Sequence, residues 1–378
     1  MNMNAPQPMN LPAGIRSRFM ENVNGLRMHI LEAGYDHDPR PLILLLHGFP
    51  ELAYSWRNII TPLADLGYHV VAPDQRGFGR TTGWSNDYDQ DLRPFNLVNL
   101  VRDAVALVNR LGYSKVNAVF GHDFGSSVAA YAGLIRPDLF QAVSMMSAPF
   151  AGAPSFADTN KEEGPDIFEE LGRLPRPRKH YHKYYSTRGA NGDMLNCPQG
   201  LHNFLRGYFH GKSADWSGND PAPLKAWTAE NIEPMPTYYI MDSDANMAET
   251  GATYMPTPEE IAVCKWLPDN ELAFFAQEFS RTGFQGGLNW YRCRFEADMI
   301  AELCLFSGRT LDVPSCFIAG EKDWGVYQKP GSFEAMQDEV CTDMRHVNLV
   351  PNSGHWVQQE QPEAVVKTLT DFLSDFAG

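Results

Sequence analysis

The sequence predicts an α/β protein built on a mostly parallel, doubly wound sheet, into which a mainly helical segment is inserted. Three observations predict this fold. Short apolar runs alternate with helical stretches between residue 15 and about 148, this pattern stops between 151 and about 294, and it returns after 309. Alternating strands and helices are typical of parallel sheets with helices on both faces.

The predicted strands carry two kinds of signal. Alternating residues follow the Asn24-Gly25 turn in NGLRMHILEAG (24–34), which predicts part of a β-hairpin. Continuous apolar runs that end in turn residues predict central parallel strands. These runs lie within PLILLLHGFP (41–50), YHVVAPDQRGFG (68–79), VNAVFGHDFG (116–125), QAVSMMSAPF (141–150), RTLDVPSCFIAGEKD (309–323) and MRHVNLVPNSGHW (344–356).

Two helices are predicted with particular clarity. LVNLVRDAVALVNRLG (97–112) has apolar residues at spacings of three and four and ends at Gly112. EAVVKTLTDFLSDFAG (363–378) carries one apolar face that suits packing on the sheet. That face consists of residues 365, 366, 369, 372, 373 and 376.

The break in the pattern predicts the domain organisation. Residues 151–294 are rich in Tyr, Pro, Asp and Asn, and the stretches 162–179 and 210–227 are interpreted as helices joined by long turns. We therefore expect one core interrupted by a helical cap, with a flexible arm at the N-terminus. The expected parts are an arm at 1–14, a core formed by 15–150 and 295–378, and a cap at 151–294.

Composition excludes several classes of function. The net charge of −15 argues against nucleic acid or an anionic membrane surface as partner, and no apolar run approaches the length of a membrane span. The six cysteines show no C-x-x-C pair, which predicts reduced thiols in a cytoplasmic protein. His180 and His182 lack the neighbouring acids or thiols of a metal site, and the Gly-rich stretch 77–83 does not match a dinucleotide loop. We expect neither a metal nor a cofactor.

The stretch VFGHDFGSS (119–127) places an aspartate, Asp123, at the centre of a tight turn between a strand and a helix. Such a turn presents one side chain at the carboxyl edge of a sheet, where a serine is the usual nucleophile. Gly121, Gly125 and Ser126 are small enough for the turn to form and for the helix to approach closely. Taken alone, the motif would more often indicate an aspartate that caps a helix.

Three further features favour catalysis. HGFPE (47–51) follows an earlier strand, so the backbone N–H of Phe49 can join that of Phe124 in an oxyanion hole. Asp323 follows a later strand, and His355 follows the last one. Nucleophile, acid and histidine in this chain order are typical of the α/β-hydrolase fold.

The motifs HGFPE…SW, DQRGFGRT, GHDFGS, TGFQGGLNWYR and NSGHW closely resemble those of α/β-hydrolase-fold epoxide hydrolases, over about residues 20–375. The resemblance implies that Asp123 is the nucleophile, Asp323 the acid that orients the histidine, and His355 the base. It also implies a cis bond between Phe49 and Pro50.

In this family two cap tyrosines hydrogen-bond the epoxide oxygen. The motif LNWYR assigns one of them to Tyr291, and KHYHKYYSTRGA (179–190) assigns the other to Tyr181. Four neighbouring cap tyrosines stay open as alternatives for the second donor: Tyr184, Tyr185, Tyr238 and Tyr239.

The expected reaction opens an epoxide to a vicinal diol. A carboxylate is ionised without help, so Asp123 can attack an sp³ carbon directly and form an ester that water, activated by His355, then hydrolyses. The expected partners are a small apolar epoxide and water, in a monomer or homodimer. The sequence leaves the particular epoxide and the regio- and enantioselectivity open.

Other functions are less compatible with the sequence. A haloalkane or haloacid dehalogenase would use the same three residues and is the alternative interpretation. Haloalkane dehalogenases typically place a halide-binding Trp where this chain has Phe124, and many epoxide hydrolases have Trp there too, so Phe124 departs from both patterns. Loss of a halide donor together with the cap tyrosine motif favours the epoxide, and residual dehalogenase activity stays open. Asp123 argues against a serine esterase. A ligand-binding protein without turnover would be expected to lack part of the catalytic set, which is complete here.

Overall fold

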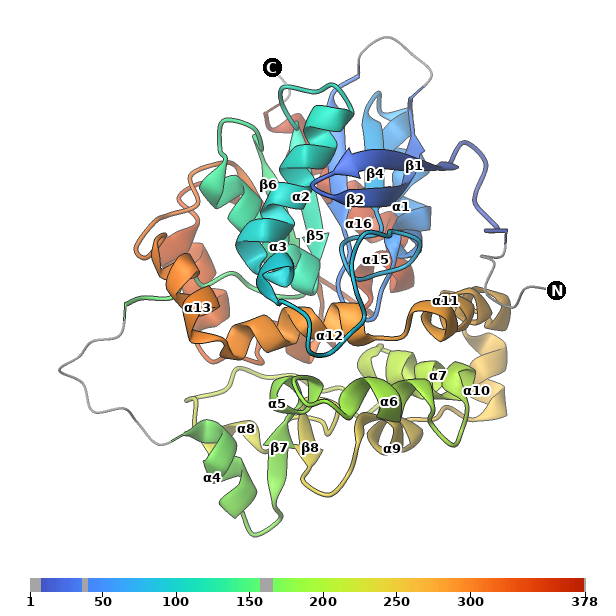
Figure 1. Cartoon of the computed structure of the whole chain (residues 1–378), viewed down its shortest axis with the longest axis vertical. Coiled ribbons are helices and arrows are strands. Elements are labelled where there is room, and N and C mark those ends of the chain that lie inside the picture. The colour runs from blue at the N-terminus through green and yellow to red at the C-terminus, as the bar shows by residue number, and fades with distance from the viewer. Residues whose placement is uncertain (1–7, 36–39, 157–165, 377–378) are drawn as a thin grey trace.

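The computed structural model describes residues 8–35, 40–156 and 166–376. Its centre is an eight-stranded sheet in the order β1-β2-β4-β3-β5-β6-β9-β10, drawn in the upper part of Figure 1. The predicted fold class is confirmed. The strands are β1 (Arg16–Val23), β2 (Leu26–Ala33), β3 (Leu42–Leu46), β4 (His69–Pro73), β5 (Ala118–His122), β6 (Val143–Met146), β9 (Ser315–Gly320) and β10 (Met344–Val350).

The sheet is antiparallel at one edge and parallel in the remainder. β1 pairs with β2 around Asn24 and Gly25, whose positive φ angles of 48° and 82° form the predicted hairpin turn. β2 also runs antiparallel to β4, whereas every pairing from β4 to β10 is parallel. The carboxyl ends of the parallel strands therefore meet at one edge.

Helices cover both faces of the sheet. α1 (Arg57–Asp65) and α16 (Pro362–Ser374) lie on one face, and α2 (Leu97–Arg110) and α3 (Phe124–Ile135) on the other. Residues along β3 alternate between the two hydrophobic cores: Ile43 and Leu45 pack toward α1 and α16, and Leu44 and Leu46 toward the opposite core. The helices expected near 97–112 and 363–378 are confirmed.

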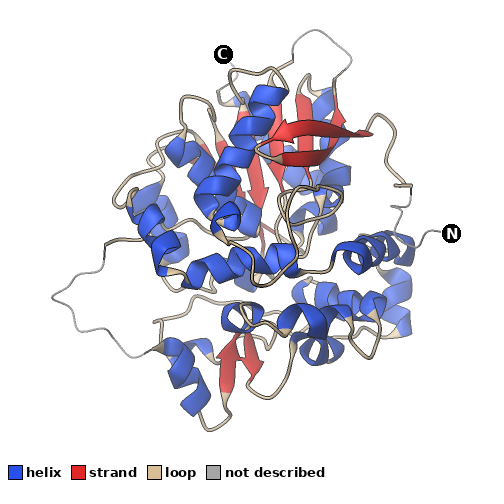
Figure 2. Ribbon diagram, in the orientation of Figure 1, coloured by secondary structure: helices blue, strands red, loops and turns tan. Residues whose placement is uncertain are grey.

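Most remaining elements lie between β6 and β9 and form the lower part of Figure 1. Figure 2 shows this part as helices around one short antiparallel ribbon, β7 (Arg178–His180) with β8 (Ile240–Asp242). α12 lies along the border with the sheet. The helices are α4 (Ile167–Arg173), α5 (Tyr181–Tyr185), α6 (Ala190–Leu195), α7 (Leu201–Lys212), α8 (Ala229–Ile232), α9 (Met247–Ala252), α10 (Pro258–Val263), α11 (Asp269–Thr282), α12 (Gln285–Arg292) and α13 (Ala297–Cys304); α14 (Ser332–Ala335) and α15 (Val357–Glu360) follow later in the chain.

Two helix predictions in this part need correction. The helix expected over 210–227 is wrong beyond Lys212, because the chain turns there and the Asn219 amide donates to the carbonyls of Gly211 and Ser213. The helix expected over 162–179 is limited to α4 and is followed by β7, since prolines at 175 and 177 remove backbone donors. Residues 162–165 lie outside the described chain.

The N-terminal segment is described only from residue 8 onward, and residues 1–7 lie outside. Met9 and Leu11 pack, partly buried, against both hydrophobic cores, and the Tyr54 hydroxyl donates to the carbonyl of Asn10. In the described ranges, no helix has the length and apolar character needed to cross a membrane.

Candidate active site

The predicted site residues meet at the carboxyl edge of the sheet. β3 leads into Phe49, β5 into Asp123, β9 into Asp323 and β10 into His355. These strands are neighbours or near neighbours in the sheet, so residues more than 200 positions apart come within contact distance. Loops at the carboxyl edge are where such folds bind ligands.

The turn at Asp123 is sterically demanding. Asp123 has φ 53° and ψ −120°, a conformation that residues other than glycine rarely adopt. A Cβ at Gly121 would lie 2.0 Å from the carbonyl oxygen of Gly125, and one at Gly125 would lie 2.3 Å from that of Leu46. Both glycines are therefore needed to bring α3 against the end of β3.

The loop after β3 binds the Asp123 carboxylate. The Phe49 N–H donates to Asp123 Oδ1 at 3.0 Å. The Phe49–Pro50 bond is cis, as the family resemblance implied. Phe124 is the first residue of α3, where N–H groups have no partner within the helix. Phe49, in the loop after β3, thus binds the carboxylate directly, and Phe124 follows Asp123 at the first position of α3.

The His355 imidazole lies between two carboxylates. Its Nε2 is 3.4 Å from Asp123 Oδ2, and its Nδ1 is 3.2 Å and 3.3 Å from the two oxygens of Asp323. All three side chains are almost completely buried. The structure therefore brings together the three residues that the sequence selected, in the order carboxylate, imidazole, carboxylate.

Ser147, which the sequence analysis missed, binds the same pair. Its hydroxyl donates to Asp323 Oδ2 at 2.5 Å and lies 2.8 Å from His355 Nδ1. Ser147 follows β6 with a φ of 69°, and the N–H of Gly325 binds the other oxygen of Asp323 at 2.7 Å. The sequence offered one signal for this role, because Ser147 is a polar residue directly after β6, the strand next to β5.

The charges around Asp123 keep its carboxylate ionised. Burial raises the pKa of Asp123, but the hydrogen bond and charge of His355 and the charges of Lys212 and His122 outweigh burial, so the pKa lies well below its usual value. The same balance of burial against His355, Ser147 and the Gly325 N–H lowers the pKa of Asp323.

A second buried acid–histidine pair supports the loops. His122 Nδ1 lies 2.6 Å from Glu51 Oε2, and His122 Nε2 lies 2.7 Å from the carbonyl oxygen of His355. Glu51 also accepts from the Gly48 N–H and from Gln358. Burial lowers the pKa of His122, but Glu51 more than reverses this, so the pKa is raised and both ring nitrogens can donate.

Other polar side chains near the site have structural contacts. His47 Nε2 accepts from the Gln75 N–H, and its Nδ1 lies near the Gly48 carbonyl. Arg76 forms a bidentate ion pair with Asp103 that holds its loop.

Of the six candidate tyrosines, Tyr181 and Tyr291 line the cavity above Asp123. Their ring centroids are 5.9 Å apart, and Tyr291 lies 5.4 Å from Phe124. The Tyr181 hydroxyl donates to Gln328 at 3.1 Å. Burial and the Asp123 charge raise the pKa of both tyrosines, which keeps them protonated.

The other four tyrosines do not line this cavity. The Tyr184 hydroxyl donates to Asp193, and the Tyr185 hydroxyl to Tyr208. The Tyr238 hydroxyl donates to Asn219, and the Tyr239 ring packs against Tyr181.

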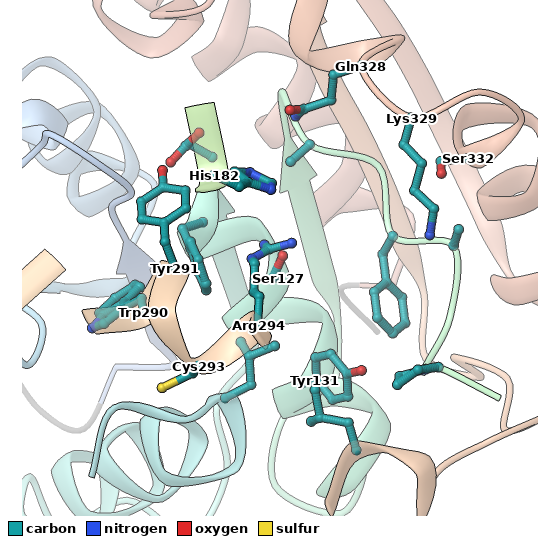
Figure 3. A pocket seen from close by; sticks show the side chains of 18 of the residues that line it. Ser127, Tyr131, His182, Trp290, Tyr291, Cys293, Arg294, Gln328, Lys329 and Ser332 are labelled. Atoms are coloured by element: carbon teal, nitrogen blue, oxygen red, sulfur yellow. The ribbon is translucent and has the colours of Figure 1, made fainter. Parts of the chain in front are cut away.

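The cavity has a volume of about 480 Å³ and is shown in Figure 3. Besides aromatic residues, it is lined by His182 and by two cations, Arg294 and Lys329, which the sequence analysis did not select. Burial, His180 and Arg294 lower the pKa of His182, so its imidazole is neutral. In the described ranges, no group of three or more His, Cys, Asp or Glu side chains could hold a metal ion.

The fold, the strained turn and the histidine between two carboxylates define an α/β-hydrolase-fold protein. A family model described as the alpha/beta hydrolase fold matches residues 41–183. The chain is 31% identical to epoxide hydrolase A of Mycobacterium tuberculosis over 369 residues, which cover 96% of this chain and 98% of that protein. It is 30% identical to epoxide hydrolase 3 of Siraitia grosvenorii over 94% of this chain and 97% of that protein.

Solved structures agree with these relatives. Potato (Solanum tuberosum) epoxide hydrolase I matches with a TM-score of 0.71 and 30% identity, over 96% of this chain and all of that chain. An epoxide hydrolase from an endophytic Streptomyces matches with a TM-score of 0.74 and 27% identity, over 96% of each chain. The chain belongs to the epoxide hydrolase family of the α/β-hydrolase fold.

Proposed function

We propose that the protein hydrolyses epoxides to vicinal diols through a covalent ester on Asp123. The observation that carries this proposal is the His355 imidazole between the Asp123 and Asp323 carboxylates, with the Phe49 N–H on Asp123 Oδ1. This arrangement supplies an ionised nucleophile, a base beside it and a donor for the oxyanion.

In the first step Asp123 attacks the epoxide. Oδ1 is bound by the Phe49 N–H, so Oδ2 forms the new bond to the epoxide carbon while the ring C–O bond breaks. The electron pair of that bond moves to the ring oxygen. Tyr181 and Tyr291, both protonated and lining the cavity, donate hydrogen bonds to the forming alkoxide, and one of them transfers its proton.

In the second step water attacks the carbonyl carbon of the ester. His355 Nε2 takes a proton from the water, while Asp323 and Ser147 hold the ring through Nδ1. The N–H groups of Phe49 and Phe124 stabilise the negative charge on Oδ1, and one such donor contributes about 3–4 kcal/mol in acyl transfer. The intermediate then expels the second diol oxygen as an alkoxide, which takes the proton held by His355. The other proton of the attacking water remains on the Asp123 carboxyl group, and its loss from that group restores the tyrosine.

We also propose the partners, the oligomeric state and the cellular location of the protein. Its partners are the epoxide and water, and the protein acts as a monomer or homodimer. The six cysteines show no paired spacing, which supports a cytoplasmic location.

The test uses His355→Gln with an aryl epoxide such as styrene oxide. The wild-type protein should form diol over many turnovers. The variant should accumulate the ester, because attack by Asp123 precedes the work of the base. Mass spectrometry should find the added mass of the epoxide on the peptide that contains Asp123.

Asp123→Asn is the matched control and should form neither ester nor diol. A His355→Gln variant that binds epoxide but never accumulates ester would contradict the assigned roles. Halide release from haloalkanes or haloacetates, without diol formation from epoxides, would instead favour a dehalogenase.

A further inference from the structure

Two cations that form no ion pair with any residue of the described ranges line the cavity, which also contains the Asp123 carboxylate. Arg294 follows α12 three residues after Tyr291, and Lys329 lies six residues after Asp323. In the described ranges neither side chain forms an ion pair or a side-chain hydrogen bond with another residue. By contrast, Arg292 donates to the carbonyl of Tyr88 and to Asn289.

Arg294 lies against the ring of Phe124, the residue that follows Asp123. Its guanidinium carbon is 4.6 Å from the centroid of that ring. In Figure 3 Arg294 extends from the wall that carries Tyr291 and Cys293 toward the middle of the cavity. Asp123 and Arg294 line the same cavity, so a substrate bound against Asp123 shares that cavity with this guanidinium.

Lys329 extends from a different wall of the same cavity. Figure 3 shows it beside Ser332, on the segment that also carries Gln328. Burial lowers the pKa of Lys329, and the charge of Arg294 lowers it further. The two positive charges repel each other, and an anion bound between them would relieve this repulsion.

The largest effects that lower the pKa of Asp123 come from other residues. They are the hydrogen bond and electrostatic interaction with His355 and the charges of Lys212 and His122. Hydroxyl groups of Ser127, Tyr131 and Ser332 line the cavity with Arg294 and Lys329. Cations beside hydroxyl donors form the chemistry that recognises a carboxylate.

We propose that Arg294 and Lys329 form an anion-binding subsite. The preferred substrates are then small molecules that carry both an epoxide and a carboxylate. The inference rests on the proposed function and deepens it. The expected substrate is therefore no longer purely apolar. Although the chain has a net charge of −15, it presents to the substrate two cations that have no ion pair within the described chain.

The test compares acids with neutral esters of the same shape. The substrates are 4-(oxiranyl)benzoic acid and 3-phenylglycidic acid, each with its methyl ester. For at least one pair the wild-type protein should have a kcat/KM about 10-fold or more higher for the acid, which corresponds to one or more charge-assisted hydrogen bonds. Arg294→Gln and Lys329→Gln should each remove most of this preference and change the kcat/KM for the ester less than about 3-fold.

Two controls separate a local subsite from a general effect of charge. Lys367→Gln removes one positive charge on α16, where Lys367 pairs with Asp371, and should leave the acid-to-ester ratio unchanged. Arg294→Lys keeps the charge and should restore part of the preference for the acid. In the wild-type protein, benzoate should inhibit competitively and benzamide should not, which tests the subsite without any variant.

The possible outcomes separate failure of the subsite proposal from failure of the proposed epoxide hydrolysis. Equal kcat/KM values for acid and ester in both pairs, together with no inhibition by benzoate, would overturn the subsite while leaving epoxide hydrolysis intact. Variants that lose activity equally on acid and ester would show that Arg294 and Lys329 act on the fold or the reaction instead. No diol from any of the four compounds would count against the proposed function itself.

Discussion

At the residue scale, an aspartate at the nucleophile turn fits attack on an sp³ carbon. The pKa of Asp123 lies below its usual value because neighbouring positive groups outweigh burial, so the carboxylate needs no base before it attacks. In the proposed mechanism, His355 therefore acts only on water. Phe124 keeps the backbone N–H needed by the oxyanion without adding an indole N–H that could bind a halide.

The roles of the cap tyrosines predict a specific kinetic effect. Tyr181→Phe and Tyr291→Phe should each slow ester formation by about 100-fold, since each removes a donor to the forming alkoxide. Hydrolysis of the ester should change little. Stopped-flow measurement of tryptophan fluorescence during a single turnover separates the two steps.

Tyr184→Phe is the matched control for these variants. Tyr184 is three residues from Tyr181, but its hydroxyl donates to Asp193 and it does not line the cavity. It should form ester at nearly the wild-type rate. A Tyr184→Phe variant as slow as Tyr181→Phe would show that the wrong cap tyrosine was assigned.

Some residues of the site could be identified from the sequence, and others could not. Asp123, Asp323 and His355 each follow a strand within a recognisable motif, so their order in the chain was informative. Ser147 binds Asp323 and His355 only because β6 lies between β5 and β9 in the sheet. Sheet order is not written in local sequence, and this residue was therefore missed.

At the element scale, the edge hairpin is held by a buried carboxylate. Glu32 on β2 binds Arg16 and Arg18 on β1 and His69 on β4. Burial raises the pKa of Glu32, but His69, Arg18 and Arg16 outweigh it and lower the pKa to about 2. Glu32 thus links three strands at the antiparallel edge of the sheet.

This carboxylate predicts a pH dependence of stability. Because the folded-state pKa is lowered, the stabilisation is fully present above the unfolded-state pKa of about 4.5 and is lost as the pH falls toward about 2. Glu32→Gln should reduce the free energy of unfolding at pH 6 by on the order of 2 kcal/mol, allowing for the exposure of its arginine partners. The difference should shrink toward pH 3 in urea denaturation.

Glu21→Gln is the control, because Glu21 pairs with Arg27 at the exposed surface. It should leave stability nearly unchanged at both pH values. A Glu32→Gln deficit that stays constant from pH 6 to pH 3 would show that packing at Glu32, and not its charge, holds the hairpin.

Strands were easier to predict than the helices of the inserted part. Central strands are buried on both faces and appear as continuous apolar runs. The segment after Lys212 was interpreted as helical, yet the Asn219 amide donates to the carbonyls of Gly211 and Ser213, and prolines at 221 and 223 remove backbone donors. Side-chain hydrogen bonds of this kind override local propensity.

At the scale of the whole molecule, the site depends on close contact between two parts of the chain. The His355 N–H donates to the carbonyl of Lys212 on α7, and the Trp356 indole donates to that of Phe209. On the other side of the site, a Cβ at Gly286 in α12 would lie 2.2 Å from the carbonyl oxygen of Gly77. These contacts bring Tyr291, also on α12, over Asp123.

The glycine contact predicts a long-range effect on catalysis. Gly286→Ala should push α12 away from the loop at Gly77, because backbone atoms cannot yield as a flexible side chain does. It should lower kcat about 10-fold or more through displacement of Tyr291, and also lower the melting temperature. Thermal unfolding and steady-state kinetics measure the two effects.

Gly192→Ala is the matched control, since a Cβ at Gly192 in α6 would meet no atom within 4 Å. It should leave activity unchanged and stability equal or slightly higher. Wild-type kinetics in Gly286→Ala would contradict the claim that this contact positions Tyr291.

The cavity itself was the least predictable feature. Its residues come from the end of β5, from α5, from α12 and from the loop after β9, which meet only in the folded chain. The sequence predicted only that the substrate is a small apolar epoxide. Arg294 and Lys329 could not be recognised because nothing in the sequence shows that they lack a partner.

The most direct test of the covalent mechanism is a single turnover in ¹⁸O-labelled water, with enzyme in excess over the epoxide. The oxygen that enters the diol should come from Asp123, and the label should appear in the Asp123 carboxylate after hydrolysis of the ester. Mass spectrometry of the diol and of the peptide containing Asp123 measures both. Label found mainly in the diol, with an unlabelled Asp123, would show direct attack by water and contradict the mechanism.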